Sequence, residues 1–260
     1  KKITMFNVLL VGDACLDVYH YGHCDRLSPE APVPVLKHDH TENRDGMSLN
    51  VRNNLIAFSL SVDSITNKKI IRKERFVDLK TRQHLLRTDF GENLKLEPCT
   101  KTQLEKIKFS DLDAVVISDY DKGFIDSTNV KIILSKAKAS NVTVFVDSKK
   151  TDLSIFEDCI IKINQSEYEK SKVFPNSYQL IVTKGADGAL WNNKTFSTER
   201  CDVFDVCGAG DTFMAALVFE YLHTRCFEKS IDFANKCARL AVQKFGTYTL
   251  TKEDIDDLRV

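Results

Sequence analysis

The stretch DVCGAGD (Asp205–Asp211) stands directly before a run of apolar residues that extends from Phe213 to Leu222. The run is apolar on nearly all sides, which predicts a buried helix. The two glycines let the preceding backbone turn tightly and approach a ligand closely. Because the start of a helix offers free N–H groups and the positive end of the helix dipole, the stretch predicts an anion-binding site.

Asp211 places a carboxylate beside this predicted anion site. A carboxylate there can accept the proton of an alcohol, while backbone N–H groups of Gly208, Ala209 and Gly210 stabilise the charge on a phosphoryl group. The stretch therefore indicates phosphoryl transfer to an alcohol. From the stretch alone, an ordinary turn in which Asp211 only caps the helix stays open as the alternative.

Short apolar runs rich in β-branched residues recur along the chain. They are near-continuous rather than alternating, as expected of strands buried on both faces. Helical spacing occurs over Leu49–Phe58, Val130–Ala137 and Ile231–Ala241, and Thr251 with Asp254 resembles a capping box. Strands that alternate with helices predict an α/β fold with a mostly parallel sheet. The predicted strands are Asn7–Val11, Ala114–Ile117, Thr143–Val146, Cys159–Ile163 and Leu180–Val182.

Two segments do not fit this alternation. Pro32–Leu36 is typical of an edge strand, because its prolines cannot donate ladder hydrogen bonds on both sides. Arg75–Phe90 indicates one or two exposed strands. We expect these segments to form a small β lid, with strands around residues 31–40 and 70–90. No linker or repeat divides the chain, so residues 1–260 are expected to form one domain with this lid.

The composition argues against several classes of protein. The 260 residues include 37 basic and 37 acidic side chains, so no net positive charge is available to hold a nucleic acid or an anionic membrane. The early apolar run Val8–Val11 is too short to cross a bilayer, and we expect no signal peptide. Eight cysteines without a C-x-x-C pair predict reduced thiols in the cytoplasm. The basic segment Lys68–Arg75 leaves a local nucleic-acid site as an alternative.

The GAGD motif of Gly208–Asp211 resembles the second signature of the ribokinase-like (PfkB) carbohydrate kinases. Asn164–Glu167 resembles the N-x-x-E motif of that family and follows a predicted strand. The resemblance implies a three-layer α/β/α sandwich with a mostly parallel sheet and a small β lid. Within the family the chain is most similar to the D-glycero-β-D-manno-heptose-7-phosphate kinases. The segments that carry this similarity are Arg26–Val35, Leu85–Asp89, Ser118–Gly123, Val146–Lys149 and Lys244–Thr247.

The resemblance implies an enzyme that uses ATP and Mg²⁺ to phosphorylate the anomeric hydroxyl of a sugar 7-phosphate. The substrate implied is D-glycero-β-D-manno-heptose 7-phosphate, which is converted to the 1,7-bisphosphate in ADP-heptose and lipopolysaccharide core biosynthesis. Asp211 is then the general base, and Gly208, Ala209 and Gly210 form the anion hole. Two alternatives stay open: a PfkB-type kinase for another sugar or sugar phosphate, and a non-catalytic carbohydrate- or nucleotide-binding relative.

The family motifs also assign binding roles. The residues that would place the sugar are Asp13, Asp17, Gly46 and Asn50. Arg87 is assigned to the phosphate of the sugar, because a guanidinium group matches that anion. The residues assigned to the nucleotide are Asn164, Glu167, Lys149, Lys184, Gly185 and Asn235. Glu167 is expected to act on Mg²⁺ through water, since this ion gives up its hydration shell reluctantly.

The chain departs from the family pattern at several positions. Met47 stands where a second glycine is usual, Leu49 where a small residue is usual, and Cys207 where a threonine is usual. Met47 and Leu49 are expected to narrow the sugar pocket. After Thr66 the chain passes almost directly into the lid, without the further helix and strand of the family, and we expect exposed apolar surface and a homodimer there. No nucleotidyltransferase half follows Val260, so a separate nucleotidyltransferase is expected to act next.

Overall fold

The computed structural model describes residues 5–244 and 246–259, so Phe245 of the segment Lys244–Thr247 lies outside the described residues. The strands of the central sheet are β1 (Asn7–Gly12), β4 (Ser61–Thr66), β7 (Ala114–Asp119), β8 (Thr143–Ser148), β9 (Cys159–Asn164), β10 (Tyr178–Thr183), β11 (Ala189–Trp191) and β12 (Lys194–Phe196). Their order across the sheet is β12-β11-β10-β9-β8-β7-β1-β4. The strands from β4 to β10 run parallel, and β11 and β12 add an antiparallel edge.

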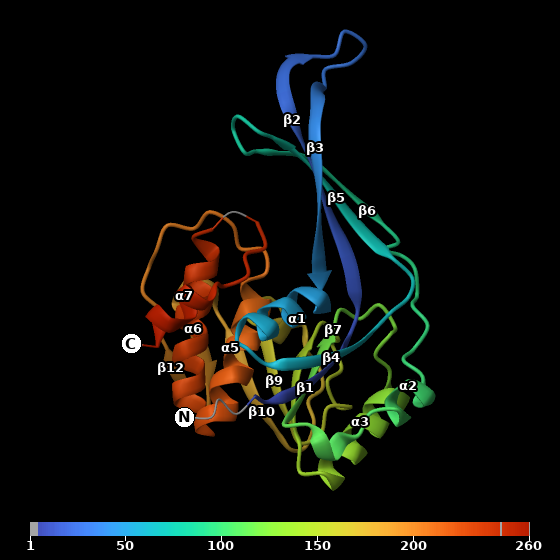
Figure 1. Cartoon of the computed structure of the whole chain (residues 1–260), viewed down its shortest axis with the longest axis vertical. Helices are drawn as coiled ribbons and strands as arrows, with labels where there is room; N and C mark the ends of the chain where they lie inside the picture. Colours follow the sequence, from blue (N-terminus) through green and yellow to red (C-terminus); the bar gives the residue numbers. More distant parts are fainter. Residues whose placement is uncertain (1–4, 245, 260) are drawn as a thin grey trace.

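Helices cover both faces of this sheet (Figure 1). The helices on one face are α1 (Ser48–Ala57), α5 (Ala209–Thr224), α6 (Phe227–Val242) and α7 (Lys252–Leu258), and those on the other are α2 (Lys101–Glu105) and α3 (Ser127–Ala139). Residues of β1 alternate between two cores: Val8 and Leu10 pack with the first group of helices, and Leu9 and Val11 with the second. The apolar runs thus belong to strands buried on both faces. The predicted three-layer α/β/α sandwich is confirmed.

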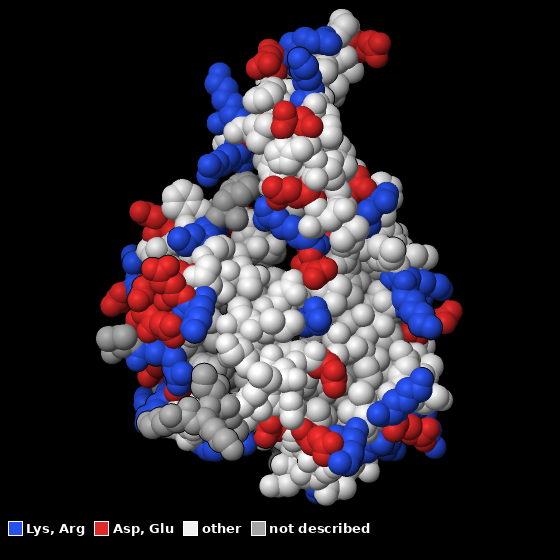
Figure 2. Space-filling model, viewed as in Figure 1, with Lys and Arg blue, Asp and Glu red and all other residues white. Residues whose placement is uncertain are grey.

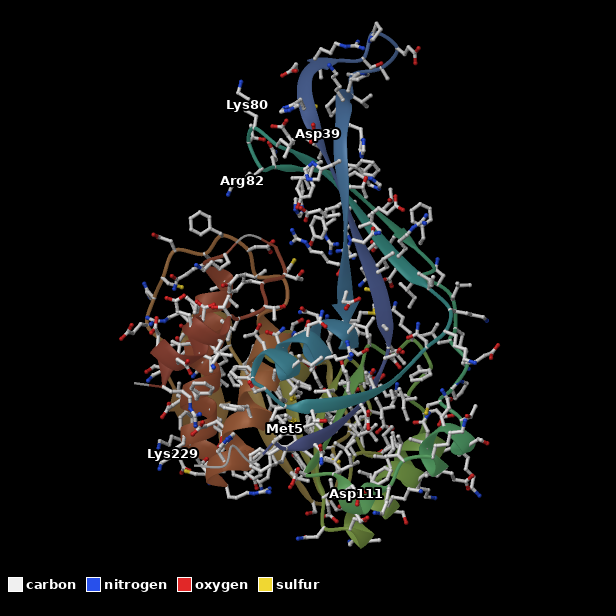
Figure 3. All side chains as sticks on the ribbon, in the orientation of Figure 1. Met5, Asp39, Lys80, Arg82, Asp111 and Lys229 are labelled. Atoms are coloured by element: carbon white, nitrogen blue, oxygen red, sulfur yellow. The ribbon has the colours of Figure 1, made fainter. Side chains whose placement is uncertain are left out.

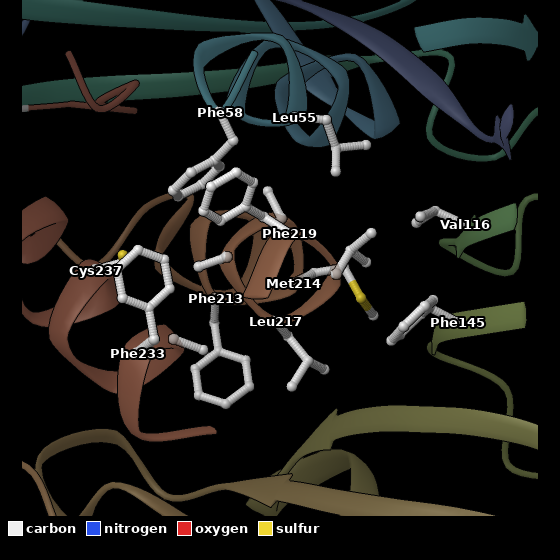
Figure 4. Packing of buried hydrophobic residues seen from close by; sticks show 14 of the residues in the cluster. Leu55, Phe58, Val116, Phe145, Phe213, Met214, Leu217, Phe219, Phe233 and Cys237 are labelled. Atoms are coloured by element: carbon white, nitrogen blue, oxygen red, sulfur yellow. The ribbon is translucent and has the colours of Figure 1, made fainter. Parts of the chain in front are cut away.

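Apolar side chains surround α5 on nearly all sides. In Figure 4 its residues Met214 and Leu217 lie between the sheet residues Val116 and Phe145 and Phe233 of α6. Its other apolar residues from Phe213 to Leu222 also belong to this core. The predicted buried helix is therefore confirmed, and the core begins directly after its first turn.

A second sheet of four strands forms the lid. Its strands are β2 (Ala14–Leu27), β3 (Pro34–Met47), β5 (Ile71–Asp78) and β6 (His84–Phe90), and their order is β3-β2-β5-β6. Figure 1 shows this sheet extending away from the three layers. Sequence analysis missed β2 entirely and ended the first lid strand too early, because the polar residues that follow Leu36 alternate with no strong apolar pattern. These two strands, of 14 residues each, are stabilised by pairing with each other rather than by an alternating apolar pattern.

The edge of the central sheet is formed by β4, which passes into β5 through residues 67–70. Among the described residues β4 pairs only with β1. The expectation of an apolar surface at this edge is wrong for the strand itself, because Ser61, Asp63 and Ser64 are its exposed residues. Ile56 and Ile70, which flank β4 in the chain, are exposed apolar residues. A short, polar edge strand resists uncontrolled pairing with other chains.

Candidate active site

The glycine turn ends where α5 begins. Gly208 is the N-cap residue of α5, and its φ of 79° lies in the left-handed region that favours glycine. A Cβ atom at Gly208 would lie 2.8 Å from Nδ2 of Asn50, so no side chain fits between the turn and α1. The N–H of Ala209 bonds back to the carbonyl of Val206 at 3.3 Å. The next N–H groups, those of Gly210 and Asp211, lie at a helix start, where intrahelical acceptors are missing.

Asp211 is the third residue of α5 and is buried. One of its carboxylate oxygens accepts a hydrogen bond from Nδ2 of Asn50 at 2.7 Å, and the hydroxyl of Tyr120 lies 3.5 Å from the other. Burial raises the pKa of Asp211 to about 6, and Asp147 adds to the rise. A carboxylate whose pKa approaches neutrality is suited to accept a proton from an alcohol. The structure thus brings two predicted site residues, Asn50 and Asp211, into direct contact.

Two predicted sugar residues, Asp17 and Gly46, meet at the base of the lid. Asp17 of β2 pairs with Arg75 of β5, with 2.6 Å between Oδ1 and Nη1, and both side chains are less than a tenth exposed. A Cβ atom at Gly46 would lie 2.3 Å from Oδ2 of Asp17. The carboxylate therefore needs a glycine at position 46. Sequence analysis placed Arg75 in the basic segment and in the predicted lid strands, and it missed this contact.

Asp13 lies deeper than the sequence predicts. Its residue is fully buried, and its Oδ2 accepts the backbone N–H of Tyr120 at 2.6 Å. Burial and the neighbouring Asp119 raise the pKa of Asp13 to about 6. Asp13 immediately follows β1, and among the described residues its Oδ1 has no hydrogen-bond partner. The Oδ2 atom thus holds the loop that carries Tyr120, and the contact of Asp13 with a sugar stays a prediction.

Arginine side chains gather on one face of the lid. Arg87 of β6 lies opposite Arg75 in the antiparallel pairing with β5, so both side chains are on that face. Arg44 of β3 lies opposite Asp17 in the pairing with β2. Arg87 forms a bidentate ion pair with Asp89, at 2.7 and 2.9 Å, and its side chain is about half exposed. The predicted phosphate ligand therefore belongs to a group of three arginines around Asp17.

The basic segment Lys68–Arg75 does not form a free positive surface. Most of its cations have acidic partners, and Figure 2 shows basic and acidic side chains mixed over the lid. In Figure 3 the labelled Lys80 and Arg82 lie at the turn between β5 and β6, away from this segment. The ion pairs of the segment are Lys69–Glu97, Arg72–Glu74, Lys73–Glu92 and Arg75–Asp17. Paired charges release few counterions, so the nucleic-acid alternative loses its support.

The N-x-x-E motif forms the start of α4 (Gln165–Lys170). Oδ1 of Asn164 accepts the N–H of Glu167 at 2.9 Å, and Oε2 of Glu167 accepts the N–H of Asn164 at 2.8 Å. These reciprocal bonds make a capping box, which explains the spacing of the motif. The second carboxylate oxygen of Glu167 pairs with Lys149 at 3.1 Å. Three residues predicted to bind the nucleotide are therefore in contact.

The donor groups fit a magnesium ion that keeps its water molecules. Among the residues that the structure describes, no group of three or more His, Cys, Asp or Glu side chains could hold a metal ion. Glu167 has one oxygen on a backbone N–H and the other on Lys149. Mg²⁺ commonly binds through water and substrate phosphates, with few protein carboxylates. A contact between Glu167 and such an ion through water stays a prediction.

A cavity of about 450 Å³ lies beside the first turn of α5. Predicted nucleotide residues in its wall are Gly185 and Asn235, and the predicted anion-hole residues Ala209 and Gly210 line it as well. Asn235 of α6 donates to the carbonyl of Phe196 at 2.8 Å. Lys184 precedes Gly185 but does not line the cavity. A wider hollow of about 1490 Å³ beside α3 contains none of the predicted site residues.

Tyr120 and Lys162 complete the site, although sequence analysis assigned neither of them a role. Tyr120 reaches Asp211, and Lys162 of β9 reaches the carbonyl of Gly210 at 3.3 Å. Tyr120 lies within Ser118–Gly123, a segment that carries the family resemblance, so a signal was present. Lys162 stands in the apolar run of β9. A lone charge in a strand buried on both faces is the signal of a buried ion pair.

Comparison with solved structures defines the class of fold. Phosphofructokinase-2 from Escherichia coli, solved in complex with potassium, superposes with a TM-score of 0.74 at 14% identity and covers 98% of each chain. Ribokinase from Arabidopsis thaliana, complexed with ribose and ATP, gives a TM-score of 0.68 at 16% identity, with 98% of this chain and 99% of that chain covered. At such identities the likeness shows the fold alone. The predicted ribokinase-like fold is confirmed.

Sequence comparison supplies the family. Residues 161–254 match the profile of the pfkB family carbohydrate kinases. The bifunctional protein HldE of Marinomonas sp. (strain MWYL1) is 31% identical over 303 aligned positions, which cover 96% of this chain and 63% of that protein. The bifunctional protein HldE of Pasteurella multocida (strain Pm70) is 30% identical, with the same coverage. Residues 161–254 thus match the pfkB carbohydrate kinases, as the sequence resemblance predicts, and the similar proteins support the predicted enzyme class.

The curated relatives are longer than this chain, which spans 63% of their length. The alignment with the Marinomonas protein also runs over 303 positions, more than the 260 residues of the chain. That protein therefore carries residues within the aligned region that this chain lacks. No described helix combines the length and apolar character needed to cross a membrane.

Proposed function

We propose that the chain transfers the γ-phosphoryl group of ATP to a hydroxyl of a sugar phosphate, with D-glycero-β-D-manno-heptose 7-phosphate as the leading substrate. The observation that carries the proposal is the buried carboxylate of Asp211 at the start of α5. It is held by Asn50 and has a pKa of about 6. Similarity to heptose-7-phosphate kinases and to bifunctional HldE proteins supports the choice of sugar.

Asp211 acts as the general base in this proposal. Its carboxylate takes the proton of the attacking hydroxyl, while the N–H groups of the glycine turn stabilise charge on the phosphoryl group. Asn50 donates to one carboxylate oxygen, and the other, which lies 3.5 Å from the hydroxyl of Tyr120, would face the acceptor. Proton transfer of this kind contributes roughly 10²–10⁴ in rate. The anion site at a helix start adds stabilisation that requires no movement at the moment of reaction.

The nucleotide is proposed to occupy the cavity beside α5. Its walls include the side chains of Val203, Val206 and Phe213, which suit the faces of a planar base. The ribokinase complexed with ribose and ATP supports ATP as the donor. When bound, Mg²⁺ neutralises phosphate charge and orients the transferring group. Lys149 and the Asn164–Glu167 pair would bind the phosphates and the hydrated ion, and Asn235 and Gly185 would border the nucleoside.

The sugar phosphate is proposed to lie between Asp211 and the lid. Asp17 would bind sugar hydroxyls, and Gly46 leaves room for its carboxylate. Arg87, together with Arg75 and Arg44 on the same face, would bind the phosphate at the far end of the sugar. Guanidinium groups match phosphate oxygens in geometry as well as in charge.

A kinase for another sugar or sugar phosphate is the second candidate. It is favoured by Met47, whose buried side chain packs in one core with Cys15 and Ile71 at the base of the lid. A bulky residue at this point reduces the space beneath the lid. A binding protein without catalysis is the remaining alternative. Asp211 with an elevated pKa argues against it, because a binding site gains nothing from a partly protonated base.

The domain organisation, compartment and partners of the enzyme are proposed as well. We propose that residues 1–260 form one kinase domain with its lid, which acts in the cytoplasm. All eight cysteines are free, as a reducing compartment would require. A homodimer, and a separate nucleotidyltransferase that uses the sugar bisphosphate, belong to the same proposal. The bifunctional names of the relatives support the link to a second activity.

The deciding experiment is a phosphorylation assay with a panel of acceptors. Heptose 7-phosphate is compared with ribose, fructose and fructose phosphates at saturating ATP, and product is identified by mass spectrometry. The proposal expects the highest kcat/KM with heptose 7-phosphate. Higher kcat/KM with another sugar phosphate would establish the second candidate. ATP binding without transfer to any acceptor would establish the non-catalytic alternative.

A further inference from the structure

Lys162 is a charged residue buried behind the glycine turn. It lies on β9 between Ile161 and Ile163, and its side chain is 4% exposed. Its ammonium group pairs with Asp147 of β8 and donates to the carbonyl of Gly210 at 3.3 Å. A Cβ atom at Gly210 would lie only 3.1 Å from that ammonium group. The first turn of α5 therefore rests directly on a buried cation.

Such an ion pair is a poor way to stabilise a fold. Removing two charges from water costs more than their attraction returns in many proteins, and apolar residues of the same size often serve as well. The neighbours of Lys162 on β9 are isoleucines, so an apolar side chain would suit this strand. What an apolar side chain cannot do is bond to the carbonyl of Gly210. That carbonyl belongs to the peptide group that joins Gly210 to Asp211.

We propose that Lys162, held by Asp147, is a positioning residue for phosphoryl transfer. Its ammonium group fixes the first peptide groups of α5 and, through them, both the anion site and the carboxylate of Asp211. The inference rests on the proposed function, because it assigns a task to a contact with the catalytic turn. Lys162 itself touches neither reacting group in this arrangement.

The pKa of Asp211 provides a measurement that would not change if Lys162 only stabilised the fold. The groups that face this carboxylate are Asn50 from α1, Tyr120 after β7, Asp147 from β8, Lys149 after β8 and Lys162 from β9. Lys162 and Lys149 lower the pKa of Asp211, whereas Asp147 raises it. Loss of Lys162 should therefore raise the pKa of Asp211, and loss of Asp147 should lower it.

The test compares Lys162→Met, Asp147→Asn and the double variant. The double variant leaves no unpaired buried charge, so it keeps the proposal testable if a single variant fails to fold. The pKa of Asp211 is measured by carbon-detected NMR, which does not require turnover, and kcat and both KM values are measured as functions of pH. Ile133→Ala, in the core on the other face of the sheet, is the control for lost stability.

We expect Lys162→Met to raise the pKa of Asp211 by about one unit and Asp147→Asn to lower it. In the double variant these shifts should largely cancel, while kcat falls roughly tenfold and KM for ATP changes little, because the turn is no longer held in its reactive geometry. Ile133→Ala should lower Tm and leave the pKa unchanged. Wild-type kcat in the double variant, or an unchanged pKa in both single variants, would overturn the proposal. An inactive wild-type enzyme would refute the proposed function instead.

Discussion

Asn50 donates a hydrogen bond to Asp211 at 2.7 Å across 161 positions of sequence. The bond joins α1, which follows the lid strand β3, to α5, which follows the glycine turn. Nδ2 of Asn50 is also the atom that a side chain at Gly208 would strike. One amide group thus orients the carboxylate and forces the preceding turn to be glycine. This hydrogen bond therefore links the element that follows the lid strand to the start of α5.

Replacement of Asp211 by Asn should abolish turnover. The amide keeps the size of the side chain and its contact with Asn50 but cannot accept the proton. A loss of roughly 10²–10⁴ in kcat is expected, because that is the usual contribution of a general base. ATP affinity, measured by calorimetry, should change little. A variant with wild-type kcat would remove Asp211 from the mechanism.

The same variant should show how burial of this carboxylate affects stability. The pKa of Asp211 is about 6 in the folded protein and 3.8 when unperturbed, so the folded state holds the proton more tightly. Its contribution to the free energy of unfolding therefore falls by up to about 3 kcal/mol as pH rises from about 4 to about 6. Asp211→Asn should be more stable than wild type at pH 8 and not at pH 4, as measured by urea unfolding. Asp63→Asn on the exposed edge strand is the control, and an equal effect at both pH values would contradict the prediction.

Replacement of Arg75 by Met should damage both folding and sugar binding. It leaves the carboxylate of Asp17 buried without its partner, and such a loss costs about 3–5 kcal/mol. Further replacement of Asp17 by Asn should restore much of the stability without restoring the KM for the sugar. Arg72→Met, whose side chain is nearly half exposed, is the matched control and should change little. Recovery of sugar KM in the double variant would mean that the pair is only structural.

At position 47 glycine should give a more stable protein than alanine, the reverse of the usual order within helices and strands. It adopts φ 55° and ψ −130°, a backbone conformation that is almost restricted to glycine. Met47→Ala loses buried contacts and keeps the strain, whereas Met47→Gly loses the same contacts and relieves it. We expect Met47→Gly to be more stable than Met47→Ala by about 1–2 kcal/mol in urea unfolding. The opposite order would show that the backbone here is not strained.

Replacement of Glu167 by Gln should separate the structural and ionic roles of the N-x-x-E motif. Glutamine can accept the N–H of Asn164 and so preserves the capping box. It removes the negative charge that a hydrated Mg²⁺ ion would face. We expect Tm to stay close to wild type, while the Mg²⁺ concentration for half-maximal rate rises several-fold. An unchanged Mg²⁺ titration would assign Glu167 to helix capping alone.

The sequence by itself determined the layers of the fold, the buried helix α5 and the glycine turn before it. These features depend on local patterns: apolar runs of strand length, helical spacing, and glycine where the backbone must turn. The capping box at Thr251 and Asp254 was likewise visible, because its bonds join residues three apart. The two family motifs marked the same turn and the start of α4.

Only the tertiary structure decided which side chains meet. The 14-residue strands of the lid, the pair between Asp17 and Arg75, and the burial of Asp13 all depend on contacts between segments distant in sequence. The contact of Lys162 with Gly210 spans 48 positions and could not be inferred from an apolar run. Pairing and desolvation depend on distance in space, and a one-dimensional pattern records neither. The tertiary structure also decided that β4 forms an edge of the central sheet, where its polar residues are exposed.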